Sequence, residues 1–308
     1  MNDSISRIKT LTRVCFALTL ILLGACTSKE ADPTVNPEAG QVTFHGAATK
    51  GPLSGSTISV YAMDSLGNKT GSALAQTTSV DGSWTITVSN PNNELLLIES
   101  DGGEYIDESD PETDINYKRR ITLQAGEVLQ GILIPGQSSA AINFFTYTLV
   151  ESFRKEIPKV LDITLAFNRV RSRAYNALGF DPLVEIPANP ILPDINSTAV
   201  EKTYALLIGG AAYAINNAAI KTGETQITYN MMEAMVKDFA DCRLDGIING
   251  LSVSLLLSLP SDLYSDIEIE NEVLRFRNNN YEQYPDTALP SWDEAAFCAA
   301  DPTLSVVL

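Results

Sequence analysis

The chain has 308 residues, and its 38 acidic residues against 21 basic ones give a formal net charge of −17 at pH 7. Such an acidic protein repels nucleic acid, and no basic stripe in the sequence would overcome that repulsion. The single histidine, His45, nearly excludes a zinc site built on His and Cys ligands, and any Ser–His–Asp mechanism would have to use this residue.

The first 25 residues have the pattern of an export signal. Arg7, Lys9 and Arg13 precede a short apolar stretch, residues 14–23, which ends in Leu-Gly-Ala-Cys26. The stretch is well short of the ~20 residues needed to cross a bilayer, which argues against a single membrane span. A plain secretory signal is the other alternative. The sequence Leu-Gly-Ala-Cys resembles the lipobox of bacterial lipoproteins.

This resemblance predicts a signal peptide over residues 1–25 and a lipid anchor on Cys26, which would carry a diacylglycerol and an N-linked acyl chain such as palmitate. Residue 27 is Thr rather than Asp. By the sorting rule of enteric lipoproteins, this indicates the outer membrane, facing either the periplasm or the cell surface. Residues 26–40 have no apolar cluster and read as a flexible tether.

Residues 41–136 alternate between apolar and polar side chains, as strands with one buried face do. The clearest strand is residues 83–88, where Trp84 alternates with two apolar residues and is expected to face the core. His45 is out of phase with the apolar residues of its strand and is expected to face solvent. Asp81-Gly82 suits a tight turn, because both residues tolerate a positive φ. We expect six or seven short strands in an antiparallel β-sandwich of the prealbumin or Ig-like type.

One motif in this region resembles a known module. Gly46-x4-Gly51-Pro52-Leu53-x-Gly55, followed by Asp81-Gly82-x-Trp84, is similar to the carboxypeptidase-regulatory-like, or Cna-B-like, sandwich of bacterial surface proteins. The resemblance covers about a third of the chain and implies a spacer or binding platform. It assigns no catalytic residue, because the module carries many functions.

Residues 137–308 change to a helical period, which predicts an all-α helical bundle. This layout resembles the helical part of bacterial lipoproteins that begin with such a sandwich, a group with no activity to transfer. The uncharged stretch 203–220 is expected to be a buried helix whose small residues let its neighbours approach closely. The expected helices are residues 140–157, 159–178, 198–221, 229–241, 247–259, 262–279 and 292–299.

Two cysteines remain after signal removal and lipidation. Cys242 and Cys298 would lie in an oxidising compartment, so we expect a disulfide between them. Two separate buried thiols are the alternative.

Two acidic clusters are candidate calcium sites, because hard cations bind clustered carboxylates. The first includes Asp107 and Asp110, and the second consists of Asp238, Asp241 and Asp245. A solvated loop and a polar turn between helices are the corresponding structural alternatives.

The sequence contains no phosphate-binding loop, nucleophile elbow or dinucleotide fingerprint. It therefore favours a non-enzymatic, lipid-anchored envelope protein whose sandwich presents a helical binding domain to an unknown protein or glycan. One alternative is a carboxylate-based hydrolase acting on an envelope or surface polysaccharide. The other is a calcium-stabilised structural surface protein.

Overall fold

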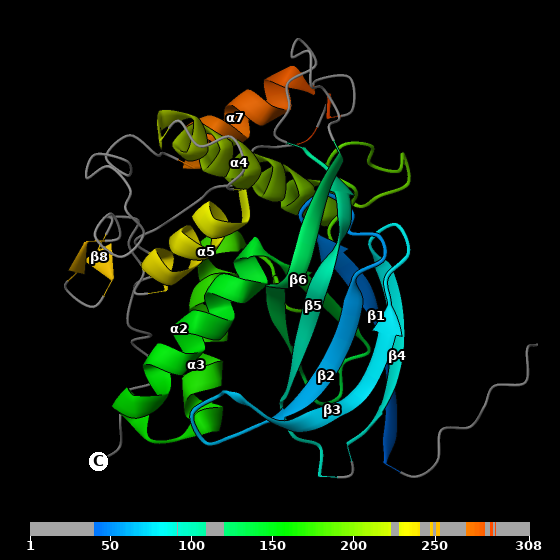
Figure 1. Cartoon of the computed structure of the whole chain (residues 1–308), viewed down its shortest axis with the longest axis vertical. Helices are drawn as coiled ribbons and strands as arrows, with labels where there is room; N and C mark the ends of the chain where they lie inside the picture. The colour runs from blue at the N-terminus through cyan, green and yellow to red at the C-terminus, as the bar shows by residue number, and fades with distance from the viewer. Residues whose placement is uncertain are drawn as a thin grey trace, which may run out of the picture. The chain divides into compact units, whose positions relative to one another are not determined.

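The computed structural model describes nine parts of the chain, all within one compact unit, Ala39–Leu308 (Figure 1). The described residues are 40–90, 92–108, 120–222, 228–240, 247–248, 251–252, 269–280, 284, 285 and 287.

Seven strands form two sheets that carry most of the described β-structure. The first sheet has the order β4-β1-β7, and the second has the order β3-β2-β5-β6. All pairings are antiparallel except that of β1 with β7, which is parallel. The strands are β1 (Gln41–Thr49), β2 (Thr57–Met63), β3 (Lys69–Thr78), β4 (Ser83–Ser89), β5 (Leu96–Ile106), β6 (Arg120–Leu133) and β7 (Ser139–Asn143).

Five described helices complete the fold, together with a two-stranded ribbon of β8 (Ile247–Ile248) and β9 (Leu251–Ser252). The ribbon lies where a helix over 247–259 was expected, so that prediction is wrong at these four residues. The expected helix over 292–299 lies outside the described residues. The helices are α2 (Phe144–Val160), α3 (Ile163–Leu178), α4 (Ala199–Thr222), α5 (Thr228–Phe239) and α7 (Ile269–Asn279).

The alternating pattern of the strands is confirmed where it was clearest. In β4, Trp84, Ile86 and Val88 are buried and the residues between them are exposed. His45 in β1 is exposed, as expected. Gly46 lies between β4 and β7, where a Cβ would overlap the Ala140 carbonyl oxygen and the Trp84 ring. Only glycine lets the three strands of the first sheet approach this closely.

The second sheet is covered on both faces. In β5, Leu96 and Ile98 pack in a core shared with the first sheet, whereas Leu97 packs with Leu149 and Phe153 of α2. Because neighbouring strand residues point to opposite faces, β5 must lie in a middle layer. The molecule therefore has three layers, sheet on sheet on helices, as Figure 1 shows with α2 and α3 beside the second sheet.

The start of α2 differs from the expected helix over 140–157. Residues 139–143 form β7, which pairs with β1 from His45 to Thr49. Asn143 then begins the helix, because its side-chain oxygen accepts hydrogen bonds from the backbone N–H groups of Phe145 and Thr146, and the Thr146 hydroxyl accepts one from the Asn143 N–H. This capping box fixes the point where strand changes to helix.

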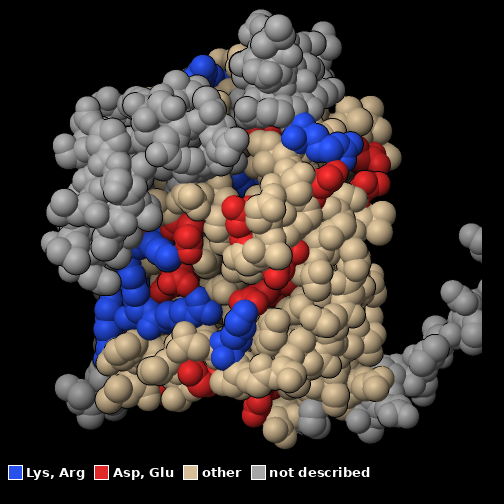
Figure 2. Space-filling model, viewed as in Figure 1, with Lys and Arg blue, Asp and Glu red and all other residues tan. Residues whose placement is uncertain are grey.

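Helices α2 and α3 form a hairpin, and a buried glutamate of α2 pairs with two arginines of α3. Leu161 and Asp162 are the only residues between the two helices. A Glu156 carboxylate oxygen lies 3.0 Å from Arg173 and another lies 3.3 Å from Arg169, both on α3. These contacts outweigh burial and lower the pKa of Glu156. Figure 2 shows basic side chains gathered over this hairpin, with acidic ones between them.

Helix α4 confirms the expectation of a buried helix with small residues at its contacts. Its described residues from Tyr204 to Ile215 are buried. A Cβ on Gly209 would overlap the ring of Phe276, and one on Gly210 would overlap Val273, both on α7. No described helix is long and apolar enough to cross a membrane.

A tyrosine of helix α5 bonds to the backbone of the last strand of the second sheet. The Tyr229 hydroxyl accepts a hydrogen bond from the Val128 N–H at 2.9 Å and donates one to the Val128 carbonyl at 3.0 Å. Burial raises the pKa of Tyr229 to about 12, so the hydroxyl keeps the proton that it donates.

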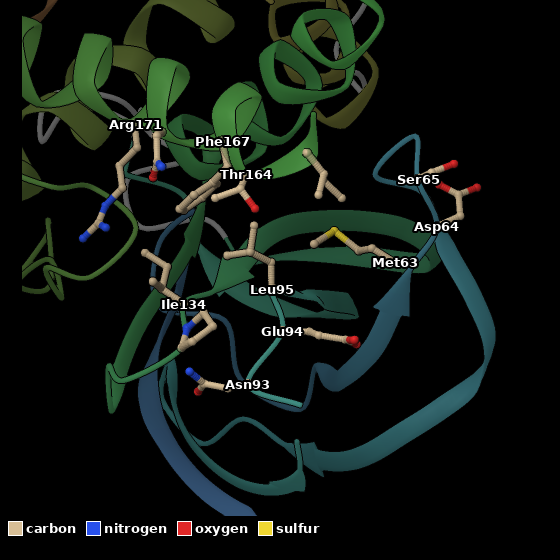
Figure 3. A pocket seen from close by; sticks show the side chains of 13 residues that line it. Met63, Asp64, Ser65, Asn93, Glu94, Leu95, Ile134, Thr164, Phe167 and Arg171 are labelled. Atoms are coloured by element: carbon tan, nitrogen blue, oxygen red, sulfur yellow. The ribbon is translucent and has the colours of Figure 1, made fainter. Parts of the chain in front are cut away.

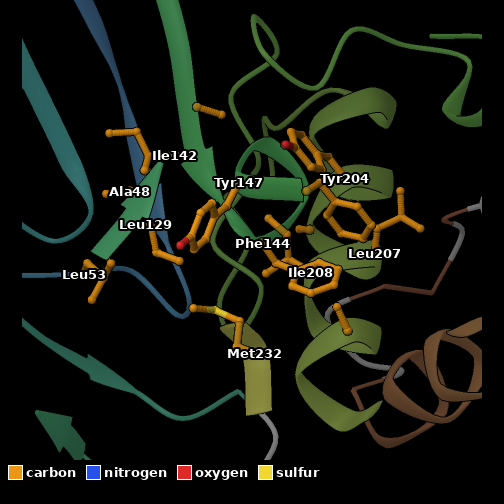
Figure 4. Packing of buried hydrophobic residues seen from close by; sticks show 14 of the residues in the cluster. Ala48, Leu53, Leu129, Ile142, Phe144, Tyr147, Tyr204, Leu207, Ile208 and Met232 are labelled. Carbon is orange, nitrogen blue, oxygen red and sulfur yellow. The ribbon is translucent and has the colours of Figure 1, made fainter. Parts of the chain in front are cut away.

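The expected fold class, an antiparallel β-sandwich followed by an all-α helical bundle, is wrong. Within the described residues, strands and helices pack together in both hydrophobic clusters, and the β1–β7 pair is parallel. In Figure 4, Ile142 and Leu129 lie near Tyr147, Tyr204 and other helical side chains. The helices cover sheet surface that would otherwise be exposed, so the described structure is a layered α and β fold.

Candidate functional site

A groove of about 560 Å³ lies between α3 and the ends of strands in the second sheet. Three segments form the sheet side: the end of β2, the residues that lead into β5, and the end of β6. Helix α3 forms the other side (Figure 3). The residues that line the groove are Met63, Asp64, Ser65, Asn93, Glu94, Leu95, Ile134, Pro135, Ile163, Thr164, Phe167, Asn168 and Arg171.

The floor of the groove is apolar and firmly packed. Phe167 and Ile134 are buried, and Met63 and Leu95 pack against the same cluster under α2 and α3. The Phe167 ring meets that of Phe153 edge to face, with centroids 6.0 Å apart. A floor set by core packing keeps its shape whether or not the groove is occupied.

The two ends of the groove carry opposite charges. Figure 3 shows Arg171 at one end and Asp64 at the other. The Arg171 guanidinium lies 2.6 Å from an Asp181 carboxylate oxygen and 6.0 Å from the Phe167 ring centroid. Asp64 accepts hydrogen bonds from the backbone N–H groups of Asn68 and Leu66, which lower the pKa of its carboxyl. Both groups are therefore charged and held in place.

Several polar side chains along the groove remain open to a ligand. Thr164 and Asn168 on α3 and Asn93 before β5 are exposed. Within the described part of the chain, no hydrogen bond occupies their side-chain hydroxyl or amide groups. A ligand in the groove would therefore find an apolar floor together with unused donors and acceptors.

A second group of charged residues is sealed inside the molecule. Lys50 and Glu108 are each 4% exposed, and the Lys50 ammonium lies 5.3 Å from the centroid of the Tyr105 ring. Burial raises the pKa of Glu108 to about 7, although Lys50 opposes that shift. Burial alone would lower the pKa of Lys50, but Tyr105, Glu108 and Asp107 outweigh burial and raise it.

The space beside this group is very small. A cavity of about 10 Å³ lies between Lys50 and Glu108 on one side and α4 on the other, where Ile208 and Ala212 line it. That volume holds about one water molecule. The sealed group therefore cannot admit an organic ligand, whereas the groove can.

Most of the candidate site residues from the sequence lie outside the described residues. These are Cys26, Cys242, Cys298, Asp110, Asp241 and Asp245. The anchor, the disulfide and the calcium sites that need these residues therefore stay predictions.

Two of the predicted metal ligands are described. Asp107 is 2% exposed beside Glu108, and Asp238 is fully buried near the end of α5. Within the described residues, no three His, Cys, Asp or Glu side chains are grouped so that they could hold a metal ion.

The groove itself was not predicted from the sequence. It combines short pieces of four segments that lie far apart in the sequence. Comparison with known proteins adds no assignment, because no protein-family model, curated protein or solved structure matches the chain.

Proposed function

We propose that this chain is a non-enzymatic, lipid-anchored protein of the cell envelope whose layered body binds a small amphipathic molecule in the groove. The observation that carries the proposal is the groove of about 560 Å³ with a packed apolar floor and unoccupied polar groups. Sites for small molecules have this combination of an apolar surface with a few placed polar groups.

The contacts of the groove indicate the kind of ligand. Met63 and Leu95 offer flexible and branched apolar surface to a hydrocarbon part. Thr164 and Asn168 offer hydrogen bonds to a neutral polar part, and the fixed charges of Asp64 and Arg171 select against a uniformly charged molecule. An apolar body with hydroxyl or amide groups therefore suits the groove best.

The placement of the acids supports binding rather than acid–base catalysis. A carboxylate-based hydrolase uses one acid of raised pKa and a second carboxylate that face the same cleft. Here the pKa is raised at Glu108, beside the small cavity, and lowered at Asp64, in the groove. The two properties that such an enzyme combines thus occur in different places.

The test is to fill the groove without disturbing the core. Asn168→Trp places a large side chain over the floor from an exposed position on α3. Native mass spectrometry of the full chain isolated from its membrane should show a bound small molecule, and this variant should lose it. The cause would be steric, because the Asn168 side chain makes no hydrogen bond in the described structure.

Asn176→Trp is the matched control, because Asn176 is also an exposed asparagine on α3 but does not line the groove. This variant should keep the bound mass. Equal retention by both variants would place the ligand elsewhere. A wild-type chain that never carries a small molecule would refute the binding function.

A further inference from the structure

The turn between α2 and α3 holds an apolar side chain in solvent. Leu161 ends α2 with φ at 56°, in the left-handed region, and is 88% exposed. Glycine or asparagine suits such a helix end better, because a larger side chain crowds the backbone there. Neither core packing nor backbone preference accounts for a leucine at this position.

A second leucine is fixed outward on the neighbouring loop. Leu66 is 54% exposed at the tip of the β2–β3 loop. Its N–H donates to an Asp64 carboxylate oxygen at 2.8 Å, and Arg154 of α2 donates to the Gly67 carbonyl at 3.1 Å. Gly67 packs on Ile157, whose carbonyl accepts from the Leu161 N–H at 2.8 Å. Both leucines therefore lie around the last turn of α2.

The chain leaves the folded body at the same end of the molecule. The Asn90 N–H donates to the Gly40 carbonyl at 2.8 Å, and the Asn90 side chain bonds both backbone groups of Glu94 at the groove. Figure 1 shows the start of β1, the β2–β3 loop and the α2–α3 turn at one end, and the loop between α3 and α4 at the opposite end. A lipid on Cys26 would bring this first end toward the membrane, through a tether that reaches at most roughly 50 Å.

We propose that the end carrying Leu66 and Leu161 rests on the lipid surface, with both leucines inserted among the lipid head groups. The proposal relies on the anchor of the proposed function. It also brings the Asp64 end of the groove close to the membrane, because Asp64 binds the Leu66 N–H, and this points to a ligand taken from the bilayer.

The charges around the two leucines suit an interface without strong attraction to anionic lipid. Lys69 and Lys159 have side chains that are 51% and 65% exposed, and each is paired with a glutamate, Glu99 at 2.7 Å and Glu156 at 3.4 Å. Asp64, Glu94 and Asp162 add acidic groups nearby, so the surface around the leucines has no excess of positive charge. Insertion of the leucines, rather than net charge, therefore makes the contact.

The test measures insertion directly in the full lipidated chain. Leu161→Trp is reconstituted into vesicles of phosphatidylethanolamine and phosphatidylglycerol with brominated acyl chains, which quench a tryptophan that enters the interface. The emission of the new tryptophan, after subtraction of the wild-type signal, should be quenched. Replacing Leu66 by Asn in the same chain should weaken the contact about 10-fold and restore much of that emission.

Ile195→Trp is the matched control, because Ile195 is also 88% exposed and belongs to the loop between α3 and α4, which Figure 1 shows at the opposite end. Its emission should not change. Equal quenching at positions 161 and 195, or none at 161 in a chain that sediments with the vesicles, would overturn the contact while leaving the anchor in place. A chain that does not sediment at all would refute both. If the wild-type chain carried no small molecule in the groove experiment, the membrane contact of the two leucines would still stand.

Discussion

The groove and the sealed Lys50–Glu108 group both collect charged side chains, but they use them differently. In the groove, the charges of Asp64 and Arg171 are held by local partners at the ends, and the polar groups between them stay open. Around Glu108, burial raises a carboxyl pKa to about 7 beside a cavity of about 10 Å³. A perturbed pKa therefore indicates a functional site only where there is also space for a ligand.

The two regions differ most in the space around their charged groups. Adding one methyl group next to the sealed group tests this difference. Gly51 has a φ of 58°, and a Cβ there would overlap the Ile106 carbonyl oxygen and approach a Glu108 carboxylate oxygen at 3.1 Å. Gly51→Ala should lower the free energy of unfolding by about 3–4 kcal/mol, since backbone strain and overlap add. Denaturant unfolding measures the change.

Gly55→Ala is the control for that measurement. Gly55 also has a positive φ, 74°, but its Cβ would meet no described atom within 4 Å. We expect a loss of about 1 kcal/mol, from backbone conformation alone. Equal losses at the two positions would mean that the group around Glu108 is not tightly packed.

The second prediction tests the charge of the sealed group. Because burial raises the pKa of Glu108 in the folded state to about 7, the folded chain binds this proton more tightly than the unfolded chain. The resulting stabilisation is complete below pH ~4.5 and is lost as the pH rises through 7. Glu108→Gln, which resembles the protonated acid, should be more stable than the wild type by roughly 2–3 kcal/mol at pH 8 and nearly equal to it at pH 4.

Glu94→Gln provides the comparison from the groove. Glu94 is exposed, so its replacement should change stability by less than about 0.5 kcal/mol at either pH. Thermal unfolding of both variants across this pH range measures the difference. A wild-type chain whose stability does not fall between pH 5 and 8 would contradict the assignment to Glu108.

The smallest effect is expected at the turn beside the groove. Leu161→Gly should raise the free energy of unfolding by roughly 0.5 kcal/mol, because glycine adopts the φ of 56° without crowding. The same variant should lose contact with the bilayer. Calorimetry measures the gain, and a clear loss of stability would show that Leu161 contributes to folding rather than to a surface contact.

The strands were the part of the fold that the sequence predicted best. In β4 the alternation of Trp84, Ile86 and Val88 with polar residues depends only on neighbours along the chain, so the buried face could be identified. The sequence also contained an unused signal for the helical layer. Leu95 to Ile98 is apolar without alternation, and such a run is typical of a strand covered on both faces.

The remainder depended on contacts between distant parts of the chain. Residues 140–143, which lie in β7, were predicted as the start of a helix, because a short apolar run is ambiguous until its partner strand is known. Likewise, Thr164, Asn93 and Met63 each look like ordinary surface residues within their own segments. They become a groove only when α3 packs beside the sheet, which local patterns do not specify.

The hydrogen bonds between the Tyr229 hydroxyl and the Val128 backbone affect how copies of this chain can associate. Strand β6 is the last strand of the described second sheet, and such an edge can pair with the same edge of another copy. Tyr229 occupies both backbone groups of Val128, as a further strand would. This phenol therefore blocks pairing with the sheet edge of another copy at that point of the strand.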